Sequence, residues 1–66
     1  MDFSEKAKVR LEHWITHSDQ HQEEYASFAQ QLEEEGKAES AKYIREMIDL
    51  SNRSTDCLRK ALKALE

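Results

Sequence analysis

Apolar residues recur every three or four positions along most of the chain, which is the spacing of one face of an α-helix. Ile15 and Ala29 widen this face in the first half, and Met47 and Ala61 widen it in the second half. Because the repeat is seven residues long in both halves, it predicts coiled-coil-like packing of two helices. The predicted contact positions are Ala7, Leu11, Trp14, Ser18, His21, Tyr25, Phe28 and Leu32, followed by Ala41, Ile44, Ile48, Ser51, Thr55, Leu58, Leu62 and Leu65.

One glycine, Gly36, separates the two helical patterns, and the chain contains no proline. Asp2 and Glu5 have the spacing of a capping box, which marks a helix start. Gly36 suits the left-handed position that follows a helix C-terminus. We therefore predict one all-α domain over residues 1–66, an antiparallel two-helix hairpin. Its first helix covers about 3–35, its turn lies at Gly36, and its second helix covers about 38–64.

Polar residues interrupt the predicted apolar face halfway along both helices. When the chain folds back at Gly36, residues whose numbers add up to about 72 face each other, and two polar stretches meet. Such a layer lowers the hydrophobic stabilisation of the hairpin because it replaces apolar contacts. Its buried polar groups also need hydrogen-bond partners. We call this feature the polar layer. Its predicted members are Ser18, His21, Ser51, Ser54 and Thr55.

The size of the chain points to a partner surface. Ordering 66 residues costs on the order of 100 kcal/mol, and two helices that touch along one seam bury too little apolar surface to offset it. Seven acidic residues and one base lie between Asp19 and Glu39, whereas the other end of the hairpin is basic. Two hairpins packed head to tail bring these opposite charges together. We expect a homodimer that forms a four-helix bundle, and binding to a different protein is the alternative.

Several classes of function are disfavoured. A net charge of −4 argues against nucleic acid as the main partner. No apolar run reaches membrane-spanning length and no export signal opens the chain, so neither a membrane nor a secreted protein is expected. The single Cys57 fits a reducing cytoplasmic location. No Glu-x-x-His pair or zinc-protease signature is present, and the neighbours His17 and Ser18 diverge on a helix, so no enzyme activity is expected.

His13, His17 and His21, which are all the histidines of the chain, stand four residues apart. Two histidines at this spacing on a helix can hold one nickel or zinc ion. The outer two lie about 12 Å apart along a helix, so all three cannot bind the same ion. We predict His17 and His21 as the primary ligands, His13 as a secondary ligand and Glu24 as an oxygen donor. Other donors could come from Asn52, Asp56 or a second chain.

A simpler interpretation of the histidines remains open. His13 lies off the predicted contact face and suits a solvated surface position. His21 lies in that face, and a simple hydrogen bond to Ser51 or Thr55 is enough to explain it there. On this view the protein is a non-catalytic structural or protein-interaction hairpin, and its polar layer sets the oligomeric register.

The segment from Leu11 to Tyr25, LEHWITHSDQHQEEY, resembles an uncharacterised helical-hairpin family with the signature His-Trp-Ile-x-His-x-x-x-His-x-x-Glu-[Phe/Tyr]. This hairpin is associated with nickel-binding proteins of the CooT type, so the resemblance implies a link to nickel handling. CooT-type proteins bind nickel through a cysteine after the initiator Met, where this chain has Asp2. A metal site here would therefore depend on the histidines. The signature positions are His13, Trp14, Ile15, His17, His21, Glu24 and Tyr25.

Overall fold

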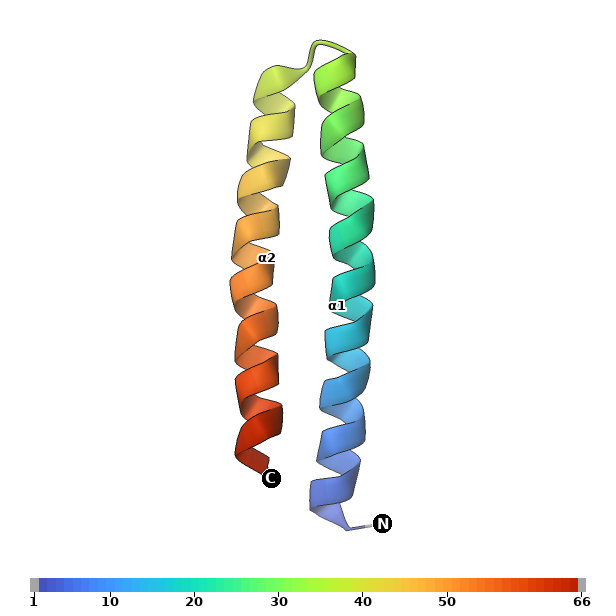
Figure 1. The fold of residues 1–66 in the computed structure, drawn as a ribbon, viewed down its shortest axis with the longest axis vertical. Coiled ribbons are helices and arrows are strands. Elements are labelled where there is room, and N and C mark those ends of the chain that lie inside the picture. The colour runs from blue at the N-terminus through green and yellow to red at the C-terminus, as the bar shows by residue number, and fades with distance from the viewer. Residues whose placement is uncertain (1, 66) are drawn as a thin grey trace.

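The computed structural model describes residues 2–65, which form two long antiparallel helices (Figure 1). Helix α1 is Phe3–Glu34 and helix α2 is Ala38–Leu65, and the Cα atoms span 51 × 16 × 10 Å. The prediction of an all-α two-helix hairpin is confirmed, and the observed helix ends lie within one residue of the predicted ones. Neither helix carries, within the described residues, an apolar stretch long enough to cross a membrane.

Local hydrogen bonds define both ends of α1. At the start, the Asp2 carboxylate Oδ1 accepts a hydrogen bond of 2.9 Å from the Glu5 backbone N–H. At the end, Gly36 has a φ of +76°, and its N–H donates to the Glu33 carbonyl at 3.0 Å. The Lys37 N–H donates to the Leu32 carbonyl at 2.7 Å. This pair of bonds is a Schellman motif, which needs a left-handed residue after the helix.

Replacing Gly36 with alanine is expected to lower the free energy of unfolding by about 1 kcal/mol. An added Cβ meets no atom within 4 Å, so the cost comes from the positive φ alone. Thermal melting followed by circular dichroism measures it. Lys37→Ala is the control and should be nearly neutral, since only the backbone of Lys37 takes part in the turn. Equal effects of the two variants would contradict this account.

The two helices pack through a strict seven-residue repeat. The facing pairs Ser18–Thr55 and Gln22–Ser51 are hydrogen-bonded, so residues whose numbers add up to 73 lie opposite each other. All the predicted contact positions from Ala41 to Leu62 are buried or half-buried. The observed repeat consists of Leu11, Ile15, Ser18, Gln22, Tyr25, Ala29 and Leu32 in α1 and Ala41, Ile44, Ile48, Ser51, Thr55, Leu58 and Leu62 in α2.

The contact face of α1 differs from the predicted one. Trp14 and Phe28, which were expected in the seam, are about half exposed, while their neighbours Ile15 and Ala29 occupy the seam positions. Ala29 is completely buried, as is Ala41 on the facing helix. A small side chain at such a position lets the two backbones approach closely, whereas a tryptophan or phenylalanine there would hold them apart.

The hairpin encloses little on its own. Among the described residues only Ala29, Ala41 and Thr55 are buried. The total accessible surface is 5297 Å², whereas a typical folded monomer of 7.8 kDa exposes roughly 4,400 Å². The rod therefore leaves roughly 900 Å² more surface in water than a compact monomer of its mass.

Candidate functional site

The polar layer is a hydrogen-bonded network at the middle of the seam. The Thr55 hydroxyl donates to the Ser51 backbone carbonyl at 3.0 Å. Since that hydroxyl has one hydrogen, the Ser18 hydroxyl is the donor in the 2.5 Å contact with Thr55 Oγ1. The Gln22 side-chain amide donates to Ser51 Oγ at 2.5 Å. The network joins the two helices and satisfies the nearly inaccessible Thr55 hydroxyl, whose residue is 1% exposed.

The structure places the predicted members of the polar layer at different depths. Ser18, Ser51 and Thr55 lie in the seam, but Ser54 is exposed. His21 flanks the seam with a side chain that is 43% exposed, and its hydrogen bond is to Glu24. Gln22 takes the place expected for His21. The seven-residue spacing from Ile15 to Ala29 through position 22 is the signal that identifies it.

Replacing Gln22 with leucine is expected to raise the melting temperature by about 5 °C, which corresponds to about 1 kcal/mol. The buried Gln22 Oε1 accepts no hydrogen bond among the described residues, and leucine removes that unsatisfied atom while adding apolar contact. Gln20→Leu, at an exposed position of the same helix, is the control and should change stability little. A lower melting temperature for Gln22→Leu would show that the amide stabilises the hairpin.

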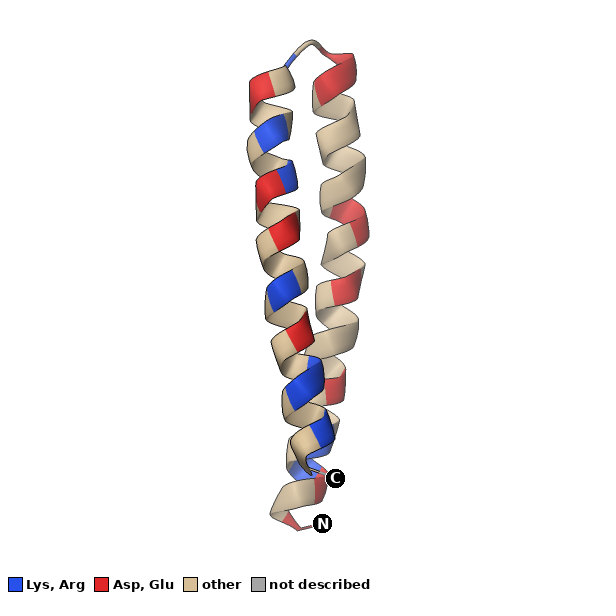
Figure 2. Ribbon diagram, turned by 60° about the vertical axis from the view of Figure 1, so that its left-hand side comes forward, with Lys and Arg blue, Asp and Glu red and all other residues tan. Residues whose placement is uncertain are grey.

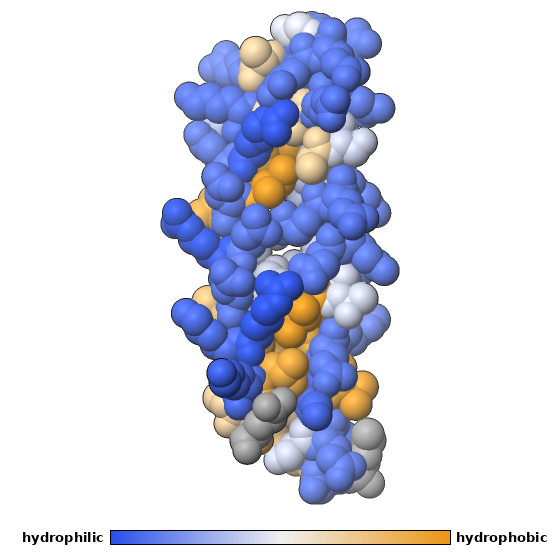
Figure 3. Space-filling model, viewed as in Figure 1, coloured by the Kyte–Doolittle hydropathy of each residue, from blue (hydrophilic) through white to orange (hydrophobic). Residues whose placement is uncertain are grey.

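Ion pairs close one edge of the hairpin. Arg59 Nη2 donates to both carboxylate oxygens of Asp19, at 3.1 and 3.0 Å, and Arg45 Nε donates to Glu33 at 2.8 Å. Arg59 also contacts Asp56 on its own helix at 3.3 Å. We call this the ion-paired edge. Figure 3 shows it as a hydrophilic face over two apolar stretches that are separated near mid-length.

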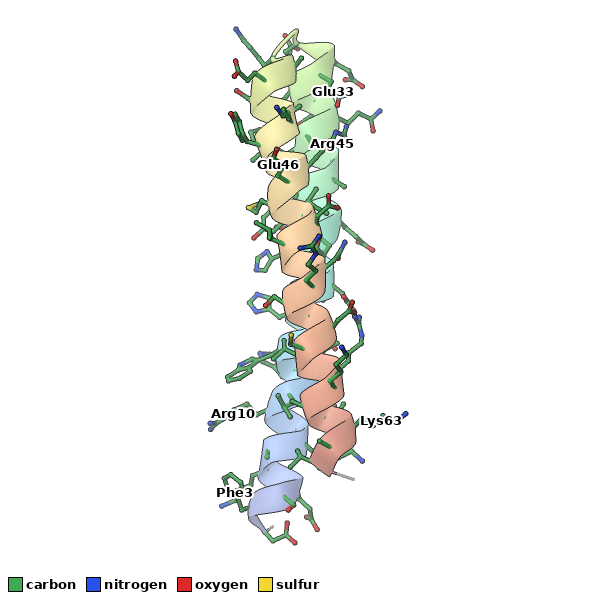
Figure 4. All side chains as sticks on the ribbon, turned by 90° about the vertical axis from the view of Figure 1, so that its left-hand side faces the viewer. Phe3, Arg10, Glu33, Arg45, Glu46 and Lys63 are labelled. Carbon is green, nitrogen blue, oxygen red and sulfur yellow. The ribbon has the colours of Figure 1, made fainter. Side chains whose placement is uncertain are left out.

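The opposite edge is rich in exposed apolar and aromatic side chains, and it also carries Arg10 and Glu24. Several large apolar residues on this side are exposed, including Phe3 at 81% and Leu50 at 63%. Figure 4 shows Phe3 and Arg10 on this side, and Glu33 and Arg45 on the other. At the end of the rod that carries the termini, a groove on this side is lined by Phe3, Ala7 and Leu65. We call this the aromatic edge, and it comprises Phe3, Trp14, His17, His21, Phe28, Tyr43, Met47 and Leu50.

Charges are distributed unevenly along the rod as well as across it. Figure 2 shows acidic residues at the turn and basic residues of both helices near the termini. Acids outnumber bases at the turn end, where Glu33, Glu34, Glu35 and Glu39 lie with Lys37 and Lys42. Bases outnumber acids at the terminal end, where Lys6, Lys8, Arg10, Lys60 and Lys63 lie with Asp2 and Glu5. The rod therefore has oppositely charged ends.

The histidines form a ladder on α1 beside the polar layer. The ring centroids of His17 and His21 are 4.4 Å apart, and those of His13 and His17 are 6.0 Å apart. The His21 ring also stacks on Tyr25, with centroids 5.8 Å apart and planes 11° from parallel. His17 and His21 are therefore the closer of the two neighbouring pairs.

Glu24 lies beside the histidine pair rather than beyond it. Its Oε2 is 3.2 Å from His21 Nδ1, so the carboxylate accepts a hydrogen bond when that nitrogen carries a proton. The Nε2 atom of His21 is then free to bind a metal, an arrangement common in metalloproteins. Asp56 is engaged by Arg59. Within residues 2–65 no three His, Cys, Asp or Glu side chains are grouped to hold a metal ion.

The fold is therefore an αα-hairpin with two different edges, the ion-paired edge and the aromatic edge. Residues 7–65 match the family described as "Domain of unknown function (DUF8180)", and the chain belongs to that family. No curated protein and no solved structure matches the chain.

Proposed function

We propose that this protein is a non-catalytic, self-associating structural module that forms an antiparallel four-helix bundle through its aromatic edge. The observation that carries the proposal is the contrast between the two edges. On one edge, ion pairs join charged side chains of the two helices. The other edge exposes Phe3, Trp14 and Phe28. Large exposed apolar patches on small proteins usually mark interaction sites.

The surface area supports a second copy as the occupant. The hairpin exposes roughly 900 Å² more than a compact monomer of its mass. A standard protein–protein interface buries about 800 Å² on each partner. Closing the aromatic edge against an equal edge therefore removes about as much surface as the isolated rod exposes in excess.

The charge distribution supports the antiparallel orientation. With the rods head to tail, the acidic turn of one copy lies beside the basic end of the other, whereas a parallel arrangement puts like charges together. Each exposed ion pair contributes at most about 1 kcal/mol, so the charges select the orientation more than they stabilise it. The twofold axis then runs perpendicular to the rods, and α1 lies against α1 of the second copy.

The polar layer supports a structural role within each hairpin. A slip of one seven-residue repeat preserves helical contact but sets Ser18 and Gln22 against apolar residues of α2, which leaves their hydrogen bonds unmade. Each unsatisfied group costs about 1–3 kcal/mol. The layer therefore holds α1 and α2 at one register, and the aromatic edge keeps one shape for a partner.

Sedimentation equilibrium tests self-association directly. The chain is expected to have twice its monomer mass at micromolar concentration, and its melting temperature should rise with protein concentration. A monomer mass throughout the micromolar and millimolar range would refute the proposal. A single mass higher than that of a dimer would refute the four-helix bundle but not self-association.

A second candidate function is reversible binding of nickel or zinc, favoured by the 4.4 Å separation of His17 and His21. The resemblance of the His13–Tyr25 segment to hairpins associated with CooT-type proteins adds support for nickel. Calorimetric titration of protein without a histidine tag tests it. Heat is expected for the native chain and none for the His17→Ala/His21→Ala double variant. No heat with either metal at neutral pH would refute this function.

A further inference from the structure

We infer that the histidine pair forms half of a metal site, and that one divalent ion is held by His17 and His21 from two copies of the chain. The inference rests on the antiparallel dimer proposed above. It specifies the ligands, the stoichiometry and the regulation of that assembly: one zinc or nickel ion, four imidazoles and two chains.

The incomplete ligand set is the first argument. Two imidazoles on one tetrahedral ion, with nitrogens about 2 Å from it, have ring centres roughly 5 Å apart, close to the observed 4.4 Å. A stable site needs three or four protein ligands. Within residues 2–65 no third donor joins the pair, because Glu24 faces His21 Nδ1. The remaining ligands must therefore come from outside the hairpin.

The position of the pair along the rod is the second argument. Helix α1 runs from Phe3 to Glu34, so its midpoint falls between Ser18 and Asp19. The midpoint between His17 and His21 is Asp19, only half a residue from this point. A twofold axis that gives full overlap of two antiparallel α1 helices passes through the midpoint of α1. The axis then sets His17 of one copy within one residue, about 1.5 Å along the helix, of the level of His21 of the other.

The position of the pair around the helix is the third argument. His21 flanks the seam on the same side as Trp14 and Phe28, one repeat before and after it. His17 lies next to it on this side, with the rings adjacent. Both imidazoles therefore belong to the edge that meets the second copy. His13 lies a turn nearer the termini and farther from the axis.

A site on the axis links metal binding to association. An ion that binds the dimer and not the monomer lowers the dimer dissociation constant by mass action. The metal thus acts as a regulator of assembly rather than as a catalyst.

Titration with zinc chloride or nickel chloride alone, followed by calorimetry and sedimentation equilibrium, tests the inference. We expect one ion per two chains and a dissociation constant lowered at least tenfold. His17→Ala/His21→Ala should remove both effects. The matched control His13→Ala, one turn away on the same helix, should keep both.

The outcomes separate this inference from the proposed function. If the chain is already dimeric without metal and then binds either no ion or one ion per chain, the shared site is overturned and the proposed dimer stands. A chain that is monomeric with and without metal overturns both. A chain that is monomeric without metal and dimeric with half an ion per chain supports the shared site and makes association metal-driven. Loss of binding in His13→Ala equal to that in the double variant would overturn the assigned ligands.

Discussion

Replacing Trp14 and Phe28 together with glutamate is expected to convert the proposed dimer into a monomer. The two side chains are 48% and 50% exposed in the single hairpin and lie on either side of the histidine pair along α1. Covering the exposed half of each ring contributes about 2 kcal/mol, and a dimer contains four of them. The dissociation constant should rise at least about a thousandfold, which corresponds to about 4 kcal/mol.

Sedimentation equilibrium measures the change, and circular dichroism reports whether the helices remain. The control is Arg45→Ala/Arg59→Ala, which removes the ion pairs of the opposite edge. Those pairs are half exposed and contribute about 1 kcal/mol or less each, so this variant should stay dimeric. If the arginine variant dissociates and the glutamate variant remains dimeric, the interface lies on the ion-paired edge and the proposal is wrong.

Replacing Ala29 with aspartate is expected to unfold the hairpin at room temperature. Ala29 is 0% exposed, at a point where the two helices meet closely. A carboxylate there loses its hydration and gains no partner, at a cost of several kcal/mol. A rod with so few buried residues has little stability in reserve. The helical signal in circular dichroism should fall to that of an unfolded chain.

Ala26→Asp is a matched control because it makes the same substitution one turn away at an exposed position of α1. Its stability should stay within about 0.5 kcal/mol of that of the native chain. A cooperative melting transition in Ala29→Asp at a temperature close to the native one would show that α1 and α2 do not pack at this level.

The ends of α1 could be predicted from sequence because single residues determine them, and the contact face of α2 could be predicted from its repeat. Asp2 and Gly36 have local physical roles at helix ends, which the cap bond and the positive φ confirm. In α2 the apolar repeat from Ala41 to Leu62 has no competing neighbour at most positions.

The face of α1 could not be fixed in the same way. Positions 14 and 15, and positions 28 and 29, are each pairs of adjacent apolar residues, so two repeats one residue apart fit equally well. Bulk favours Trp14 and Phe28, but the close approach of two helices favours Ala29. That choice depends on the distance between the helices, which no local pattern contains.

The spacing of the histidines in the candidate site could be predicted from sequence, but the side-chain contacts between α1 and α2 could not. The four-residue interval between His17 and His21 implies adjacent rings on any helix. The cross-helix ion pairs of Arg45 and Arg59 depend on the register between α1 and α2, since their partners lie 12 and 40 residues away in sequence. Gln22 became recognisable as a member of the polar layer only once the face of α1 was known.

The difference between the two edges also limits how far assembly can proceed. A rod that was apolar on both sides could add copies on each side and grow into an open-ended polymer. Here Asp19 and Glu33 are already paired with arginines on one side, so a second copy that covers the other side would leave a largely charged surface in water. In the proposed dimer, growth would therefore stop after one addition, and the same asymmetry that exposes the aromatic rings would protect the protein from forming fibres.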